Sequence, residues 1–399
     1  MALAKEVSKA FIVAAKRTPF GTFGGRLAAF SQTDLQEIAA RAALEAGNVK
    51  PENVDSVVIG NVFHSSIDGA YTPRHVSIRL GMKTETPGHA VNRLCGSGFQ
   101  SVVTACQEIE LGLSNVVLTG GTENMSQAPY VLRNARFGIK LGTDPVLEDA
   151  LWKGLIDQQI KTPMGVTAEN LATKYNISRE ESDTFAVRSQ TKWFEGQESG
   201  AFKMEMVPIK VKTRKGEEIM EIDEHPKPKA TVESLAKLPS VFKKNGTVNA
   251  GNASGICDGA GCVIVASEQA VKDQNLTPLA SITGYAISGC DPSIMGIGPV
   301  PAIRALLSKT GKSVGDVDIF DINEAFAPQF LACQKELGLD PEKTNVNGGA
   351  IALGHPVGAS GSRITAHLAH ELRRRNANIA VGSACIGGGQ GIAIMMERC

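Results

Sequence analysis

The sequence predicts an α/β protein made of two similar halves. Short apolar strands alternate with amphipathic helices over the first third of the chain and again over the last third, which is the pattern of a sheet buried between helices. Three features of the first third recur in the last third, each 262 or 263 residues later. Such a constant offset argues for a duplicated α/β unit. The recurring features are a strand ending at Asn61 and at Asn323, a glycine-containing motif around Ser97 and around Ser360, and a strand running from Val116 and from Ile379.

The first elements of the N-terminal half follow from local patterns. The segment "AFIVAAKRTP" predicts a strand that ends in a turn. A helix is expected over "TDLQEIAARAALEAG" because its apolar residues share one face, with Thr33 as the cap and Gly47 as the stop. Strands are then expected at "VDSVVIGNV" and "NVVLTGG", with a cysteine-containing loop and a helix between them.

The middle of the chain differs in composition from both ends. Both tryptophans, Trp152 and Trp193, lie there with charged runs such as "KVKTRKGEEIMEIDEHPKPK". We interpret this region as an inserted, partly irregular domain that covers substrate, although a solvated surface excursion would carry the same charges. The expected division is an N-terminal core half (residues 1–125), an inserted loop domain (126–256), a return to the N-terminal half (257–278) and a C-terminal core half (279–399).

Composition argues against several classes of function. Lys plus Arg equals Asp plus Glu at 41 each, and aromatics are 5%, so no nucleic-acid partner is expected. No apolar run has membrane-spanning length. Eight scattered cysteines fit free thiols in a reducing compartment. The ending "MERC" is not a peroxisomal tripeptide. Basic residues outnumber the acidic residue Glu6 near the N-terminus, which fits an uncleaved mitochondrial targeting segment. The basic residues are Lys5, Lys9, Lys16 and Arg17.

Four loops carry the candidate chemistry. They contain Cys95 in "NRLCGSG", Asn323 in "DINEAFAP", His355 in "GGAIALGHPVG" and Cys385 in "GSACIGGGQG". Cys95 stands just before a predicted helix, where unpaired N–H groups and the helix dipole favour a thiolate. Corresponding loops of two packed halves meet at the seam between them, which is a usual place for a pocket.

Competing motifs fail on inspection. The run "TGKS" lacks the first glycine of a phosphate loop, because Leu306 stands there. The run "GGGQG" precedes a strand rather than a helix, which argues against dinucleotide binding. Cys257 and Cys262 have no second pair to complete a zinc site, and no metal is expected. His367 and His370 lie three apart on a helix without a carboxylate motif and are interpreted as surface residues.

Two thiols and an imidazole indicate acyl transfer. One thiolate can attack a carbonyl and hold an acyl group as a thioester, with the imidazole taking its proton. The second thiol can move a proton on a carbon next to a carbonyl if N–H groups stabilise the enolate oxygen. This is the chemistry of carbon–carbon bond cleavage or formation, and the residues alone leave simple acyl transfer open.

The chain resembles the thiolase family, and especially its animal mitochondrial, degradative branch. The motifs that carry the resemblance run in order along the whole chain: "NRLCGSGFQS", "GGTENMSQAP", "NAGNASG", "NEAFAP", "NGGAIALGHPVGASGSR" and "CIGGGQG". The resemblance implies a duplicated five-layered α-β-α-β-α core with an inserted loop domain. It also implies a homotetramer built as a dimer of dimers, located in the mitochondrial matrix, with the cytosol as the runner-up.

The resemblance also implies the roles of individual residues. Cys95 is the nucleophile, His355 its activator, Asn323 the holder of a water, and Cys385 the acid/base. The backbone N–H groups of Cys95 and Gly387 form an oxyanion site. Acyl-CoA and coenzyme A are the expected partners, with CoA as a co-substrate and no permanently bound cofactor. The residues implied to contact CoA are Ser254, Lys227 and Met164.

Two departures from the family pattern bear on the substrate. Ala230 stands where relatives commonly have a hydroxyl residue near the nucleotide, and Pro163 stands where acetoacetyl-CoA thiolases carry a histidine. The second argues against a short-chain, biosynthetic enzyme and leaves room for a longer acyl chain. The expected function is therefore the CoA-dependent cleavage of 3-ketoacyl-CoA in fatty acid β-oxidation. The alternatives are an acetyl-CoA C-acetyltransferase and a non-catalytic acyl-CoA carrier.

Overall fold

Strands from both halves pair into one sheet in the computed structural model, which describes residues 9–214 and 216–399. The strands are β1 (Ala10–Arg17), β2 (Gly21–Thr22), β3 (Ser56–Gly60), β4 (Gly88–Val91), β5 (Val116–Asn124), β12 (Cys257–Ser267), β13 (Ala280–Gly289), β14 (Ile319–Ile322), β15 (Ile379–Ile386) and β16 (Gln390–Arg398). Their order is β14-β15-β16-β13-β1-β12-β5-β3-β4, with β2 beside β12. The halves join where β1 and β13 pair antiparallel over three residues each. Lys5 and Glu6 of the expected mitochondrial targeting segment lie outside the described residues.

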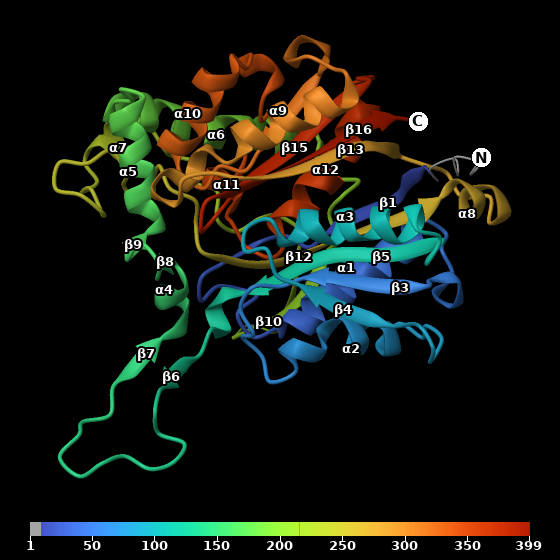
Figure 1. The fold of residues 1–399 in the computed structure, drawn as a ribbon, viewed down its shortest axis with the longest axis horizontal. Coiled ribbons are helices and arrows are strands. Elements are labelled where there is room, and N and C mark those ends of the chain that lie inside the picture. Colours follow the sequence, from blue (N-terminus) through green and yellow to red (C-terminus); the bar gives the residue numbers. More distant parts are fainter. Residues whose placement is uncertain (1–8, 215) are drawn as a thin grey trace, which may run out of the picture.

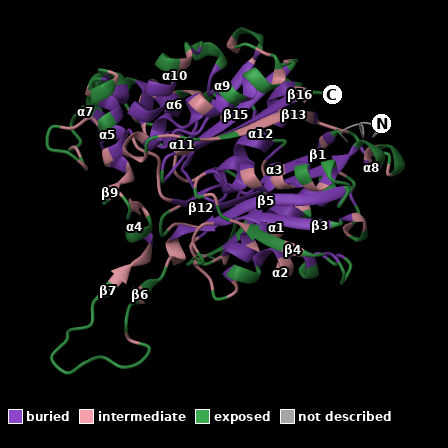
Figure 2. Ribbon diagram, viewed as in Figure 1, coloured by how far each residue is buried: buried purple, intermediate pink, exposed green. Residues whose placement is uncertain are grey.

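The helices and the two parts of the sheet together form five layers (Figure 1). The helices of the two halves are α1 (Gln32–Ala46), α2 (Thr72–Arg79), α3 (Ser97–Glu110), α8 (Glu268–Asp273), α9 (Pro299–Thr310), α10 (Ala327–Leu337), α11 (Ala350–Leu353) and α12 (Ser360–Arg374). Helices α3 and α12 pack between the two parts of the sheet, in a core shared with β5, β12 and β16. Helices α1 and α2 cover the outer face of one part, and α9 and α10 that of the other. The expected five-layered thiolase-like core is confirmed, and most residues of its middle layer are buried, with exposed side chains near the C-terminal ends of α3 and α12 (Figure 2).

The two halves repeat the same topology. In the first, β3 pairs parallel with β5, and β5 and β1 flank β12 antiparallel. In the second, β14 pairs parallel with β15, and β15 and β13 flank β16 antiparallel. The central helices touch at corresponding glycines: a Cβ on Gly361 would lie 2.2 Å from the backbone nitrogen of Phe99, and one on Gly98 would lie 2.5 Å from that of Ser362. Only glycine permits so close a contact of two backbones.

The start of α1 differs from the expectation. Ser31 is the N-cap: its hydroxyl accepts from Asp34 N–H at 3.1 Å, and the Asp34 carboxylate accepts from Ser31 N–H at 3.0 Å. This reciprocal pair satisfies two otherwise unpaired donors. Thr33 instead lies inside the helix, where its hydroxyl bonds to that of Thr72 at 2.9 Å. Gly47 ends the helix as expected.

The chain between β5 and β12 forms a partly irregular region with a long projecting loop over residues 133–146 (Figure 1). Its elements are β6 (Tyr130–Leu132), β7 (Leu147–Asp149), α4 (Ala150–Gly154), β8 (Ile156–Asp157), β9 (Thr162–Pro163), α5 (Met164–Lys174), α6 (Arg179–Glu198), β10 (Ile209–Thr213), β11 (Gly216–Met220) and α7 (Val232–Ala236). Short 3₁₀ turns complete the fold at Pro51–Asn53, Gly69–Tyr71, Met125–Gln127, Pro292–Ile297, Val314–Asp316 and Pro341–Lys343.

A buried ionic cluster ties this region to the core, so it is more than a solvated excursion. Arg17 at the end of β1 bonds to Glu205 at 2.6 Å and to Asp223 at 2.7 Å, and all three side chains are buried. Trp193 donates to Asp223 at 3.2 Å. His367 of α12 completes the cluster by bonding to Glu205 at 2.7 Å. The expectation of a surface position was wrong for His367, which is 4% exposed because the inserted region covers it.

Candidate active site

Cys95 occupies a tight turn at the start of α3. Leu94, directly before it, has a φ of 47°, a left-handed conformation that is uncommon for a non-glycine residue. The Ser97 hydroxyl holds the turn by accepting from Arg93 N–H at 2.9 Å and donating to the Leu94 carbonyl at 2.7 Å. A Cβ on Gly96 would lie 2.6 Å from the Ile386 side chain. Hydrogen bonds and packing therefore fix where the sulfur points.

The resting Cys95 is a thiol, which contradicts the thiolate expected from its place before a helix. Burial raises the pKa of Cys95 to about 11, and the negative charge of Glu123 raises it further. The backbone N–H of Gly387 lowers the pKa of Cys95 by donating a hydrogen bond to the sulfur. Removal of the thiolate from water outweighs the favourable helix terminus. The sulfur therefore needs a base to become nucleophilic.

His355 lies in the loop between α11 and α12 and supplies a neutral imidazole. Burial, together with the positive charge of Arg363, lowers the pKa of His355 to about 3. Its Nδ1 lies 2.5 Å from the Ser360 hydroxyl, which itself donates to the Pro356 carbonyl at 3.1 Å. Because the single hydroxyl proton points at Pro356, we assign the imidazole proton to Nδ1. This assignment leaves Nε2 free to accept a proton.

Asn323 and the His355 loop are held together by neighbouring backbone. The Asn323 amide nitrogen lies 3.4 Å from His355 Nε2, and its backbone N–H donates to the Ser383 carbonyl at 2.9 Å. His355 N–H donates to the Gly255 carbonyl at 2.9 Å. Within the described residues the side-chain oxygen of Asn323 is buried without a hydrogen-bond partner. A buried acceptor of this kind is normally satisfied by water.

Cys385 is fully buried near the end of β15, beside Met295 and Ala325. Burial raises the pKa of Cys385 well above its ordinary value, and the interaction with Cys95 raises it further. The thiol is therefore protonated, as a proton donor must be. Directly after β15, Gly388 and Gly389 adopt φ values of 79° and 83°, which suit glycine in a sharp turn between two paired strands.

Two cavities meet at Cys95. One, of about 170 Å³, is lined by both Cys95 and His355 and reaches Ser254 and Phe242 of the inserted region. The other, of about 240 Å³, has Phe63 in its wall. The residues common to both cavities are Cys95, Leu155, Met164 and Val357. The sulfur is thus accessible to two different parts of a substrate.

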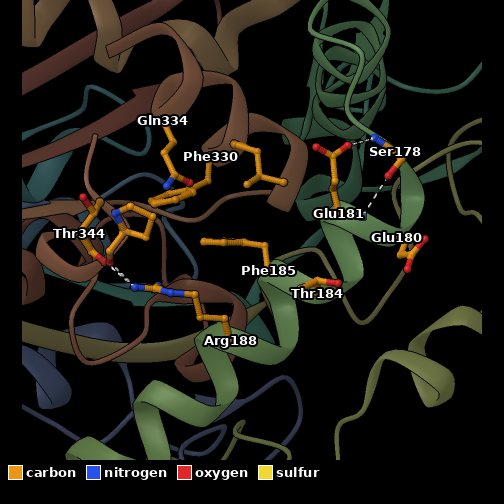
Figure 3. Close-up of a pocket in the computed structure, with 11 residues that line it drawn as sticks. Ser178, Glu180, Glu181, Thr184, Phe185, Arg188, Phe330, Gln334 and Thr344 are labelled. Carbon is orange, nitrogen blue, oxygen red and sulfur yellow. Dashed lines mark hydrogen bonds between the residues drawn. The ribbon is translucent and has the colours of Figure 1, made fainter. Parts of the chain in front are cut away.

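The structure gathers most, but not all, of the predicted site residues. Cys95, His355, Met164 and Ser254 line the smaller cavity, and Gly387 lines the larger. Cys385, Asn323 and Lys227 line neither of these cavities. The Lys227 side chain is exposed, and its backbone N–H donates to Gln190 at 2.8 Å. A third cavity of about 400 Å³ lies between α6 and α10, with the stacked rings of Phe185 and Phe330 in its wall (Figure 3). It is lined by neither cysteine nor histidine.

Two residues that act on the site could not be recognised from the sequence. Ser360 was noticed only as the repeat partner of Ser97, and its bond to His355 required the fold. Glu123 lies in the quoted motif "GGTENMSQAP", but the motif gave no sign of its burial or of its action on Cys95. In the described part of the chain, no group of three or more His, Cys, Asp or Glu could hold a metal ion. No helix there is both long enough and apolar enough to cross a bilayer.

Family comparisons cover nearly the whole chain. The thiolase N-terminal domain matches residues 10–269, and the thiolase C-terminal domain matches residues 276–398. The chain belongs to the thiolase family and is an acyltransferase of that family.

Individual proteins of the family are similar to this chain over nearly its whole length. The mitochondrial 3-ketoacyl-CoA thiolase of Mus musculus is 65% identical over 97% of this chain and 98% of its own length. The crystal structure of human mitochondrial 3-ketoacyl-CoA thiolase in complex with CoA has a TM-score of 0.97 at 61% identity, covering 98% of each chain. An acetyl-CoA acetyltransferase of Chromobacterium violaceum is 46% identical over 97% of this chain and 99% of its own length.

Proposed function

We propose that this chain is a 3-ketoacyl-CoA thiolase that shortens 3-ketoacyl-CoA by two carbons in fatty acid β-oxidation. The observation that carries the proposal is the meeting of a thiol, a neutral imidazole and a second thiol: Cys95 and His355 line one cavity, and Cys385 interacts with Cys95. The 65% identity to a mitochondrial 3-ketoacyl-CoA thiolase favours this function over an acetyl-CoA acetyltransferase, at 46%.

In the proposed first half-reaction, the Cys95 sulfur attacks the 3-keto carbon while His355 Nε2 takes the thiol proton. The bond between C2 and C3 then breaks, and its electrons form the enolate of acetyl-CoA. Cys385 protonates C2, so that acetyl-CoA leaves and a thioester remains on Cys95. The buried, protonated state of Cys385 supports this donor role.

In the proposed second half-reaction, the thiol of CoA attacks the acyl-cysteine and gives its proton to the Cys385 thiolate. His355 returns its proton to the departing Cys95 sulfur, which restores the resting enzyme. Backbone N–H groups of Cys95 and Gly387 serve as one oxyanion site, and Asn323 holds the water that, with His355, serves as the other. The unpaired oxygen of Asn323 supports this water.

Coenzyme A is the proposed co-substrate, and the inserted segment 126–256 is proposed to cover it. Met164 and Ser254 line the cavity that contains His355, which supports contact with the pantetheine arm. Lys227 is exposed, which suits a cation that meets a phosphate at the nucleotide end. No further cofactor enters the proposed cycle.

The proposed location is the mitochondrial matrix, and the proposed assembly is a homotetramer. The names of the mammalian relatives support the mitochondrion. Phe137 and Leu141 are fully exposed on the projecting loop, which supports burial of this loop against another subunit.

Cleavage assays across chain lengths test the function. The loss of 3-ketoacyl-CoA absorbance should depend on CoA and should occur with ketohexanoyl- and ketohexadecanoyl-CoA as well as with acetoacetyl-CoA. Turnover of acetoacetyl-CoA alone would identify an acetyltransferase, and no turnover of any substrate would reject the proposal.

Trapping the intermediate tests the division of roles. Mass spectrometry should find an acyl adduct on Cys95 in the wild type and none in Cys95→Ala. The variant Cys385→Ala should retain acyl exchange but lose carbon–carbon cleavage. Equal loss of acylation in both variants would refute this division, and release of unmodified ligand by the wild type would indicate a carrier.

A further inference from the structure

Glu123 is a buried carboxylate next to residues that line the larger cavity at Cys95, and the proposed reaction does not use it. It lies near the end of β5 and is 0% exposed. Each oxygen accepts two hydrogen bonds. One accepts from the Asn61 amide at 3.1 Å and from Phe63 N–H at 3.0 Å, and the other accepts from Val62 N–H at 3.1 Å and from Gly358 N–H at 3.0 Å.

These neighbours fit an ionised side chain. All four are donors, and the orientation of Asn61 is fixed because its amide also donates to the Thr122 carbonyl while its oxygen accepts from Gln32. A protonated Glu123 would point its O–H at an N–H group. No Lys, Arg or His forms an ion pair with Glu123 among residues 9–214 and 216–399. The donors alone therefore hold the negative charge.

The negative charge of Glu123 raises the pKa of the Cys95 thiol. Burial raises the pKa of Glu123 to about 8, so the side chain is ionised over the range in which Cys95, with a pKa of about 11, loses its proton. Among the described residues, the titratable groups near Cys95 are Glu123, Cys385, His355 and Asp157. Asp157 lines the larger cavity together with Cys95, and His355 is neutral throughout that range.

The hydrogen bonds of Glu123 also join two segments that line the larger cavity at Cys95. Val62 and Phe63 line this cavity, as does Val357, which is next to Gly358. A single carboxylate thus fixes the separation of segments that are almost 300 residues apart in sequence.

We propose that Glu123 is a positioning residue of this enzyme, which holds together the segments that line the cavity at the nucleophile and, in its ionised form, opposes loss of the Cys95 proton. This inference rests on the proposed role of Cys95 as nucleophile. A negative charge close to a sulfur opposes thiolate formation, so removing the charge should make the resting thiol more acidic.

The test is the pH dependence of Cys95 alkylation by iodoacetamide, followed by mass spectrometry of the labelled peptide. The variant Glu123→Gln should lower the pH midpoint of labelling by about one unit, which is about a tenfold faster reaction at a fixed pH between about 8, where Glu123 is ionised, and the midpoint. Glu123→Asp keeps the charge while loosening the hydrogen bonds, and its midpoint should stay near that of the wild type. Glu169→Gln is the matched control, because Glu169 is also buried and accepts two backbone N–H groups, at 2.8 Å each.

An unmoved midpoint in Glu123→Gln would overturn the proposal, as would equal shifts in the Gln and Asp variants, since these would reflect loosening alone. Alkylation needs no turnover, so its result is independent of whether the chain cleaves 3-ketoacyl-CoA. If Glu123→Gln does not fold, infrared spectra of the wild type, with the glutamate bands assigned by Glu123→Asp, decide the matter. A protonated Glu123 band that persists up to the pH at which Cys95 is labelled would overturn the proposal.

Discussion

Removing the Ser360 hydroxyl should slow Cys95 acylation without weakening CoA binding. The hydroxyl lies 2.5 Å from His355 Nδ1, and both residues are buried. In Ser360→Ala the Nδ1–H group loses its acceptor, and an unpaired buried donor costs about 1–3 kcal/mol. If this destabilises the tautomer that has Nε2 free, acylation should slow by roughly 5- to 150-fold.

Rapid-quench measurement of the acyl-enzyme is the assay, with 3-ketoacyl-CoA in excess and CoA affinity measured separately. Ser362→Ala is the matched control, because Ser362 lies on the same helix, is buried, and its hydroxyl donates to the Ala359 carbonyl at 2.8 Å. An acylation rate in Ser360→Ala within twofold of the wild-type rate would refute the assigned tautomer. Equal slowing in Ser362→Ala would point to a general disturbance of α12.

Three further predictions concern stability. Replacing Arg17 by Met should lower the free energy of unfolding by about 3–5 kcal/mol, because two buried carboxylates lose their cation; a loss below about 1 kcal/mol in urea titrations would contradict this. Gly361→Ala should destabilise the protein by about 1–3 kcal/mol or more, because the new methyl group would meet the Phe99 backbone. By the same measurement Gly315→Ala should be near neutral, because a Cβ there would lie 3.7 Å from its nearest neighbour, the Ser313 hydroxyl. Burial lowers the pKa of His355 to about 3, so between about pH 6.5 and pH 3 the unfolded chain binds a proton that the folded chain does not. Stability should therefore fall as the pH drops through this window, by up to about 1.4 kcal/mol per unit from this group; His355→Gln should show a shallower slope, and an unchanged slope would argue against the burial of a neutral imidazole.

Local sequence was enough to predict the repeated halves and to single out the four loops that carry the candidate site. Strand and helix periodicity depends on neighbouring residues, and the constant offset between Ser97 and Ser360 reflects a duplication that the strand order repeats. The same local reasoning misjudged the cap of α1, because Ser31 and Thr33 are both good capping residues and only the backbone decides between them.

Properties that depend on burial could not be predicted in this way. The helix start next to Cys95 indicated a thiolate, but the groups that bury the sulfur and oppose its ionisation come from distant segments, including Leu155, Val357 and Glu123. His367 was expected at the surface because its partner Glu205 lies 162 residues away. Desolvation depends on everything packed around a group, and no short pattern records it.

The sequence by itself determined the fold class, the duplication and the candidates for the reactive side chains, because each is encoded in residue types at short or regular spacing. Only the tertiary structure decided the protonation of Cys95 and Cys385, the tautomer of His355 and the hydrogen bonds that Glu123 accepts from two distant segments. These depend on desolvation and on hydrogen bonds between segments that meet only when the two halves and the inserted region pack together.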